Sequence, residues 1–296
     1  MRKKIKKEWL WAYLFIAPIV IGTLIFGVIP IIYSFLISLT NWNGIGDRLF
    51  VGIKNFVTLL HDEKMIHEIK NTLAYTIASV PLTLVFSVVV AVLLNQGLKA
   101  TGFFRVIYFL PNIVMPVAAA MVWRFMLNSK TGIVNAFLSW LHLPTPNWIS
   151  DPKFIMASIV IVSVWSGIGY NAIILLAGLQ SISGEVYEAA RLDGAPPFTT
   201  FCRITVPLLS PTLFFLLTMG VMNGMKAFDV IFTFTQNVDG GPLLEASRTL
   251  VYGIYNRAFS LMGFGEASAE AVILFVMIMF VTVIQFKLQK KWVYYE

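Results

Sequence analysis

The sequence predicts an all-α, polytopic membrane protein with six transmembrane helices. The prediction depends on three observations. Of the 296 residues, 58% are hydrophobic and only 12% are charged, with a mean hydropathy of +0.79. A soluble domain is about a quarter charged. One soluble core could not bury so much apolar surface, so a membrane is the simplest explanation for it. The apolar residues also gather in long uninterrupted stretches.

Six stretches are apolar over the roughly 20 residues that a spanning helix needs. They cover residues 10–39, 72–95, 106–127, 154–179, 208–232 and 269–287. The first follows a strongly basic N-terminus, as the apolar region of a signal peptide would. It is about twice too long for that region, which has roughly 7–15 residues, and no clear cleavage site follows it. We therefore expect a retained transmembrane helix there.

The positions of Lys and Arg predict the orientation. If the N-terminus is cytoplasmic, the inside segments carry more Lys and Arg than the outside segments, although they are shorter in total. The positive-inside rule then places both termini in the cytoplasm of a multi-pass protein in a bacterial-type plasma membrane. The formal net charge of +7 and the pI of about 9.4 come largely from these flanking residues. They indicate membrane topology and not nucleic-acid binding.

Several chemical classes lack their sequence signals. The single cysteine, Cys202, excludes an intrachain disulfide and a cysteine-based metal cluster. His61, His67 and His142 fall in polar connections, where we expect them at the surface. No Gly-x-x-x-x-Gly-Lys-Ser/Thr segment occurs, so the sequence has no P-loop for ATP phosphates. No cluster of histidines or paired carboxylates lies in an apolar stretch, which argues against a membrane-embedded enzyme.

The connection between the fourth and fifth stretches, residues 181–207, has a distinct local pattern. Residues 185–192 are strong helix formers. Gly194 can adopt the positive φ that ends a helix, and Pro196 and Pro197 suit a turn and the start of a second helix. The pattern predicts two short cytoplasmic helices joined at a sharp corner. The pattern alone also fits a solvated loop that binds nothing.

The same segment resembles the cytoplasmic loop of binding-protein-dependent ABC importers. The pattern of that loop is Glu-Ala-Ala, three residues, Gly, nine residues and Ile-x-Leu-Pro; residues 188–190, 194 and 204–207 match it, with Val206 in place of Leu. In that family the loop docks onto the ATPase subunit. The resemblance therefore implies that this coupling loop (residues 181–207) contacts an ATPase through six residues, Glu188, Ala189, Ala190, Arg191, Asp193 and Gly194, with Gly194 forming the corner.

The resemblance extends over nearly the whole chain and is closest to the carbohydrate branch with an extra N-terminal helix. It is carried by residues 50–56, 71–73, 105–111, 132–135, 176–180, 228–229, 240–242 and 255–259. Between Thr235 and Gly240 the chain is a few residues longer than usual. The resemblance implies the type I ABC importer permease fold and a translocation-pore subunit of a sugar importer that has no ATPase site of its own and works by alternating access.

The resemblance also implies the partners and the division of the chain. The partners are a second homologous permease, two ATPase subunits that bind ATP and magnesium, and an extracytoplasmic solute-binding protein. In the branch that this chain resembles, the partner permease has a glycine-rich C-terminal tail. This sequence ends in Lys290-Lys291-Trp292 without such a tail, so we expect it to be one half of a heterodimer. The expected parts are an N-terminal helix with an external segment (1–68), a transmembrane core (69–288) that contains the coupling loop, and a cytoplasmic tail (289–296).

Polar and aromatic residues inside apolar stretches are candidates for the solute pathway, because polar groups are costly at membrane depth. The candidates are Asn112, Trp165, Tyr170, Asn171, Asn223, Lys226 and Asp229. Each also has a structural alternative. An asparagine can bond to a neighbouring helix at a modest gain, and Lys226 and Asp229 are three residues apart and could pair on one helix face. Arg124 is expected to be an interfacial or structural charge.

Two other transporter classes remain as alternatives. A permease that imports a different kind of solute would carry the same coupling loop, and only the other matching segments favour carbohydrate. A secondary transporter usually shows internal repeats and acidic residues at membrane depth. The chain shows no repeat, and its apolar stretches contain almost no acidic residue; Asp229 lies near the end of one. A self-sufficient transporter is therefore the weaker alternative.

Overall fold

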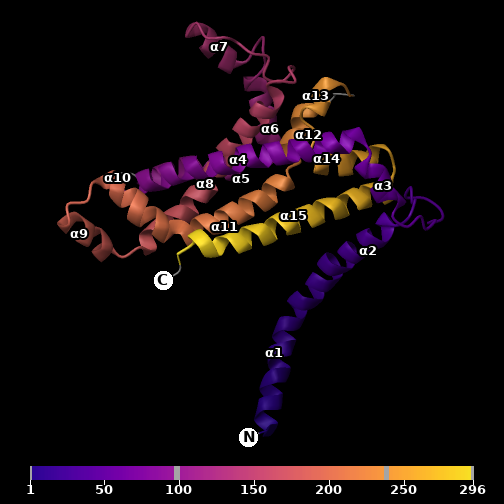
Figure 1. The fold of residues 1–296 in the computed structure, drawn as a ribbon, viewed down its shortest axis with the longest axis horizontal. Helices are drawn as coiled ribbons and strands as arrows, with labels where there is room; N and C mark the ends of the chain where they lie inside the picture. The colour runs from indigo at the N-terminus through magenta and orange to yellow at the C-terminus, as the bar shows by residue number, and fades with distance from the viewer. Residues whose placement is uncertain (1, 97–100, 237–239, 295–296) are drawn as a thin grey trace. The chain divides into compact units, whose positions relative to one another are not determined.

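The computed structural model describes residues 2–96, 101–236 and 240–294 of the chain (Figure 1). The extra length expected just before Gly240 falls on residues 237–239, which lie outside the described residues. The chain divides into two compact units. The terminal unit comprises residues 1–62 and 254–275, and the core unit comprises residues 63–253 and 276–296.

The described part of the chain is helical and contains five helical stretches that are long and apolar enough to cross a membrane. These stretches are Glu8–Ser38, Glu63–Asn95, Ile155–Ser181, Pro197–Thr235 and Phe264–Trp292. They correspond to five of the six predicted stretches. The last, helix α15 (Phe264–Trp292), is longer at both ends than the apolar run that predicted it.

The predicted stretch 106–127 is not one straight span. It is divided between α5 (Thr101–Ile113) and α6 (Pro116–Met126), which meet at an angle of 97°. Pro116 occupies the first turn of α6, where the missing N–H costs nothing, and Met115 before it is extended with φ −53° and ψ 126°. Two prolines within six residues thus end one helix and start another. The pair supplies a sixth span only if both halves are counted together.

The terminal unit begins with a continuous helical run: α1 (Arg2–Thr23), a π-helical segment (Leu24–Val28) and α2 (Ile29–Ser38). No residue in the most apolar part of this run is buried by protein, as expected of a helix that faces lipid. The rest of the unit is α3 (Lys54–Leu60), a π-helical segment (Asn256–Ser260) and the first part of α15.

The core unit is built on α4 (Glu63–Asn95), α8 (Ile155–Ser181) and α11 (Val206–Met225), with α5 packed against α8. Figure 1 shows α4, α8 and α11 alongside one another, with the coupling loop beyond one end. The shorter helices of the unit are α7 (Ile133–Trp140), α9 (Gly184–Leu192), α10 (Pro197–Thr200), α12 (Asp229–Thr235), α13 (Pro242–Glu245) and α14 (Leu250–Tyr255), which runs into the terminal unit.

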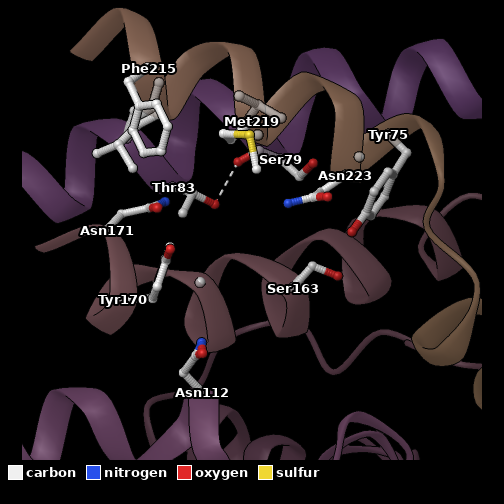
Figure 2. Close-up of a pocket in the computed structure, with 16 residues that line it drawn as sticks. Tyr75, Ser79, Thr83, Asn112, Ser163, Tyr170, Asn171, Phe215, Met219 and Asn223 are labelled. Carbon is white, nitrogen blue, oxygen red and sulfur yellow. Dashed lines mark hydrogen bonds between the residues drawn. The ribbon is translucent and has the colours of Figure 1, made fainter. Parts of the chain in front are cut away.

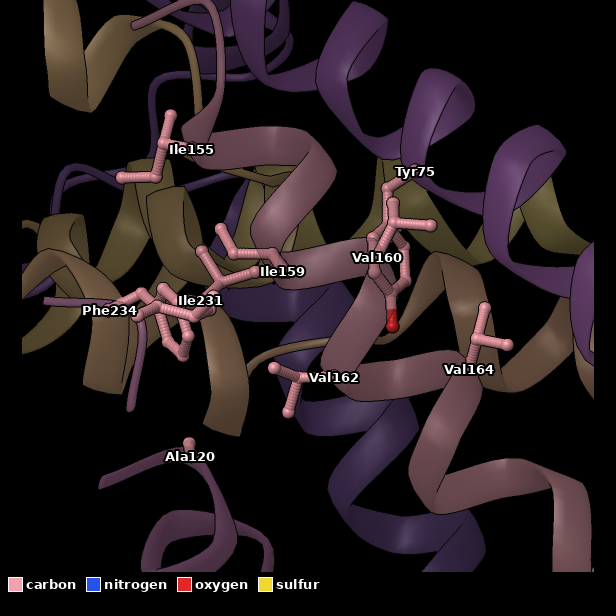
Figure 3. Close-up of a cluster of buried hydrophobic side chains, with 10 residues drawn as sticks. Tyr75, Ala120, Ile155, Ile159, Val160, Val162, Val164, Ile231 and Phe234 are labelled. Atoms are coloured by element: carbon pink, nitrogen blue, oxygen red, sulfur yellow. The ribbon is translucent and has the colours of Figure 1, made fainter. Parts of the chain in front are cut away.

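A cluster of buried apolar side chains holds α4, α6, α8 and α12 together (Figure 3). Ile155, Ile159 and Val162 of α8 are fully buried in one cluster with Ile231 and Phe234 of α12, and Ile159 lies beside Ile231 in the view. Their spacing of three and four residues places them on one face of α8, so the face that meets α12 is continuous. A second cluster joins α4, α8 and α11 nearer the coupling loop.

Two arginines in segments expected to lie outside the membrane, Arg248 and Arg257, are buried in ion pairs. In the core unit, Arg248 donates from Nε to Oε1 of Glu68 at 2.8 Å, and both side chains are at most 7% exposed. In the terminal unit, Arg257 donates to Glu270 at 2.7 Å and to Asp62 at 2.8 Å. Composition could not reveal these pairs, because the partners are far apart along the chain or in separate stretches.

Candidate functional site

The coupling loop contains the corner that its sequence predicts. Ser183 caps α9 by accepting a hydrogen bond from the Glu185 N–H at 3.3 Å, and α9 ends at Leu192. Gly194 follows with φ +71°, a conformation that residues with a Cβ rarely adopt. Pro196 is extended, and Pro197 occupies the first position of α10. The loop is therefore two short helices around a left-handed glycine.

The surface that this corner presents is mixed in character. Glu188, Arg191 and Asp193 are exposed, whereas Ala190 packs inward. Two apolar side chains are also held in the open: Leu192 is 89% exposed and Phe198 is 78% exposed. Sequence analysis did not select Leu192 or Phe198. Their signal was available, since large apolar residues that flank a tight polar turn usually have a partner.

A π-helical segment, Phe201–Thr205, connects α10 to α11. Within it, the Thr205 hydroxyl lies 3.2 Å from the Tyr187 hydroxyl of α9. At the same end of the unit, the Tyr294 N–H donates to the Ser210 hydroxyl at 2.9 Å, and Trp292 packs edge-on against Phe214. The base of α11 is thus joined both to the coupling loop and to the C-terminal segment.

A cavity of about 410 Å³, the central cavity, lies among α4, α5, α8 and α11 of the core unit. Each long helix lines it with residues about four apart, which share one helix face. The lining residues are Tyr75, Ser79, Val80, Thr83 and Leu84 of α4, Asn112 of α5, Ser163, Gly167, Tyr170 and Asn171 of α8, and Phe215, Leu216, Met219, Gly220, Asn223 and Gly224 of α11.

Figure 2 shows how the polar groups are directed. The amides of Asn171 and Asn223 point toward the same space from opposite sides, and Asn112 and the Tyr170 hydroxyl enter from α5 and α8. The hydroxyls of Thr83 and Ser163 instead bond to carbonyls of their own helices, at 2.7 and 2.9 Å. These two hydroxyls therefore bond to their own helices, whereas the amides face the cavity.

The structure brings together four of the seven predicted pathway residues, namely Asn112, Tyr170, Asn171 and Asn223. Trp165 lies elsewhere: it packs edge-on against Trp123 at 5.4 Å and lines a separate apolar groove. Sequence analysis missed Tyr75, Ser79 and Thr83. Their spacing of four along a predicted span was a usable signal, because three polar side chains repeated on one face of an apolar helix mark a polar surface.

Lys226 and Asp229 do not line the central cavity, and the structural alternative, a pair between them on one helix face, does not form either. The helix ends at Met225 and α12 begins at Asp229, so the three-residue spacing no longer places both side chains on one face. Among the described residues no ion pair joins them. Arg124 has the structural role that was expected, since it donates to the carbonyls of Thr233 and Gln236 at the end of α12, at 3.1 and 3.3 Å.

Comparison with known proteins matches nearly the full length of the chain. Residues 98–294 match the family described as "Binding-protein-dependent transport system inner membrane component". A probable ABC transporter permease, YesP of Bacillus subtilis, is 35% identical over 99% of this chain and 95% of its own. The trehalose/maltose transport permease MalF of Thermococcus litoralis is 33% identical over 93% and 92% of the two chains.

The fold has a solved counterpart. A chain of a bacterial alginate ABC transporter, solved in complex with an alginate pentasaccharide-bound periplasmic protein, superposes with a TM-score of 0.85. That match covers 98% of this chain and 97% of the other, at 25% sequence identity. The match agrees with the predicted importer permease fold. The chain therefore belongs to the family of binding-protein-dependent transport system inner membrane components, the permeases of ABC importers.

Proposed function

We propose that this chain forms one half of the translocation path of an ATP-driven carbohydrate importer. The central cavity carries the proposal: four apolar helices converge on three asparagine amides and a tyrosine hydroxyl. Polar groups at membrane depth are costly, and here they are directed into a cavity of the size that small ligands use, about 300–1,000 Å³. Relatives named for trehalose/maltose and for multiple sugar-binding transport support a carbohydrate as the solute.

The proposed partners are a second, homologous permease, two ATPase subunits and an extracytoplasmic solute-binding protein. The chain has no P-loop of its own, so ATP and magnesium would be bound by the ATPase subunits. Leu192 and Phe198 support a protein partner at the coupling loop, because large apolar side chains exposed together mark interaction sites. The acidic and basic side chains of Glu188, Arg191 and Asp193 would fix the register of that contact.

The proposed mechanism is alternating access with both termini in the cytoplasm. Closure of the ATPase subunits on ATP would move the coupling loop, and α11 would follow because η2 (Phe201–Thr205) joins the loop to it directly. The central cavity would then open toward the binding protein. A loaded binding protein and ATP favour the same state of the bundle, so each increases the affinity for the other. The proposed pathway contacts in this chain are Asn112, Tyr170, Asn171 and Asn223.

The test begins with purification of the chain from its native membrane in mild detergent. We expect a second permease and a P-loop ATPase to copurify, and mass spectrometry measures this. Reconstituted with the binding protein, the complex should hydrolyse ATP several-fold faster when that protein carries a sugar. A chain that purifies alone or as a homodimer would contradict the proposed partners. Stimulation by an amino acid, and by no sugar, would assign the importer to another solute class.

A further inference from the structure

We infer that the central cavity selects uncharged carbohydrate and excludes uronate and phosphorylated sugars, an inference that rests on the proposed function. All 16 residues that line the cavity in the described part of the chain are uncharged. The lining contains no Asp, Glu, His, Lys or Arg. A charged solute would therefore meet only neutral dipoles from this half of the path.

The polar groups of the cavity match hydroxyls better than carboxylates. Each asparagine amide offers two donors and a carbonyl acceptor, and the Tyr170 hydroxyl both donates and accepts. A sugar hydroxyl likewise donates one hydrogen bond and accepts others. An ionised carboxylate or phosphate only accepts hydrogen bonds. The carbonyl oxygens of Asn112, Asn171 and Asn223 would therefore find no donor on it.

The helix ends near the cavity also disfavour an anion. Asn112 lies in the last turn of α5, and Asn223 lies in the last turn of α11. The C-terminal end of a helix carries a partial negative charge and leaves carbonyls without intrahelical partners. Pro111 removes one more N–H from the α5 ladder. The last turns of two helices thus contribute to the lining, whereas no lining residue lies in the first turn of a helix, the end that would stabilise an anion.

The nearest cation along α11, Lys226, does not make the cavity suitable for an anion. Lys226 is the exposed C-cap of α11 and is not among the lining residues. An ammonium at a helix C-terminus is stabilised by the helix dipole itself, so its charge offsets the carbonyls beside it. The cavity consequently differs from a site built for acidic sugars, in which an arginine or lysine would pair with each carboxylate or phosphate.

The test measures binding to the permease directly, because a solute-binding protein would impose its own selectivity. The whole importer with its copurified partners is placed in lipid nanodiscs without the binding protein. Saturation-transfer NMR then compares two probe sets of equal chain length: mixed neutral di- to tetrasaccharides, and uronate-containing di- to tetrasaccharides. We expect neutral members to bind and uronates to bind at least tenfold more weakly.

Variants locate the binding. Asn223→Ala and Asn171→Ala should each lower the neutral signal several-fold, whereas Asn147→Ala, a matched change on an outside connection, should leave it unchanged. Asn223→Asp, which adds an acceptor and a negative charge, should lower the neutral signal and abolish residual uronate binding. Lys226→Ala should leave the ratio between neutral and acidic probes unchanged.

The outcomes distinguish a failure of this inference from a failure of the proposed function. Uronates that bind as well as neutral sugars, or a uronate signal that Lys226→Ala removes, would overturn the inference and leave a carbohydrate importer. If no sugar bound and no sugar-loaded binding protein stimulated ATP hydrolysis, the proposed function would fail, and the inference with it. Neutral binding that depends on Asn171 and Asn223 would support both.

Discussion

The packed interior of the core unit and the coupling loop both depend on glycine, for different reasons. In the interior, Gly169 of α8 lies so close to α5 that an added Cβ would overlap the carbonyl of Tyr108. In the loop, nothing lies within 4 Å of a Cβ built on Gly194, and the constraint is the φ of +71°. The interior glycine is required by a neighbouring helix, whereas the loop glycine is required by its own backbone.

Charged side chains also differ between the interior of the core unit and the coupling loop. In the interior, Glu68 and Arg248 are buried and paired. In the coupling loop, Glu188, Arg191 and Asp193 stand in solvent. In the interior, charged residues and glycines therefore stabilise the packing. In the loop, they shape and line an exposed surface. Changes in the interior should lower stability, and changes in the loop should lower partner binding while the helices stay folded.

The largest effect is expected from Arg248→Ala. The substitution leaves the Glu68 carboxylate buried without the arginine, and breaking a buried pair in this way costs about 3–5 kcal/mol. Thermal unfolding of the purified complex in detergent measures the loss. Arg203→Ala, at an exposed arginine of the loop, should change stability by less than about 0.5 kcal/mol.

A double variant sharpens the first prediction. Glu68→Met with Arg248→Met removes both charges and keeps the volume, so most of the stability should return. If the double variant were as unstable as Arg248→Ala, the cost would come from lost packing or from the Asn71 bonds to the Glu245 and Arg248 carbonyls nearby.

Gly169→Ala should come next in size. Its methyl group must displace the α5 backbone, and overpacking of this kind costs about 1–3 kcal/mol. Because Tyr108 and Asn112 lie on the same helix, the central cavity should also change shape, and solute binding should weaken. Gly102→Ala, an α5 position where a Cβ meets nothing within 4 Å, is the matched control and should be neutral or slightly stabilising.

Gly194→Ala tests the loop. The left-handed conformation costs a residue with a Cβ about 1–2 kcal/mol, which the loop can relieve by opening its corner. We expect the spans to unfold at nearly the normal temperature while copurifying ATPase decreases several-fold. Gly184→Ala, at the start of α9 with open space around it, should retain the ATPase. Normal ATPase recovery with Gly194→Ala would show that the corner geometry is not needed for docking.

The smallest effect is expected from Ser210→Ala. It removes the acceptor for the Tyr294 N–H, a single hydrogen bond worth about 0.5–1.5 kcal/mol. Hydrogen exchange at the Tyr294 amide should become faster, with little change in overall stability. Unchanged exchange would mean that the contact of Trp292 with Phe214 alone holds the C-terminal segment.

Local chemistry in the sequence was sufficient for several features. Five of the six apolar runs that predicted spans are long helices, and the residues from Glu185 to Pro197 predicted the coupling corner and its positive φ. The histidines are exposed as expected. These features depend on residues near one another in the chain, so hydropathy and backbone preference determine them directly.

Features that join distant residues required the tertiary structure. The 106–127 stretch is long enough for one span, and the structure revealed that its two halves meet at 97°. In the sequence, three asparagines were pathway candidates on the same grounds as Lys226 and Asp229. The packing of α5, α8 and α11 brought the asparagines, Asn112, Asn171 and Asn223, to the central cavity, but neither Lys226 nor Asp229. The partner of Arg248 lies 180 residues away. The sequence by itself determined which segments are helical and where the corner turns, because those depend on local propensity. The tertiary structure decided which polar groups meet and which charges are buried, because those depend on how helices pack.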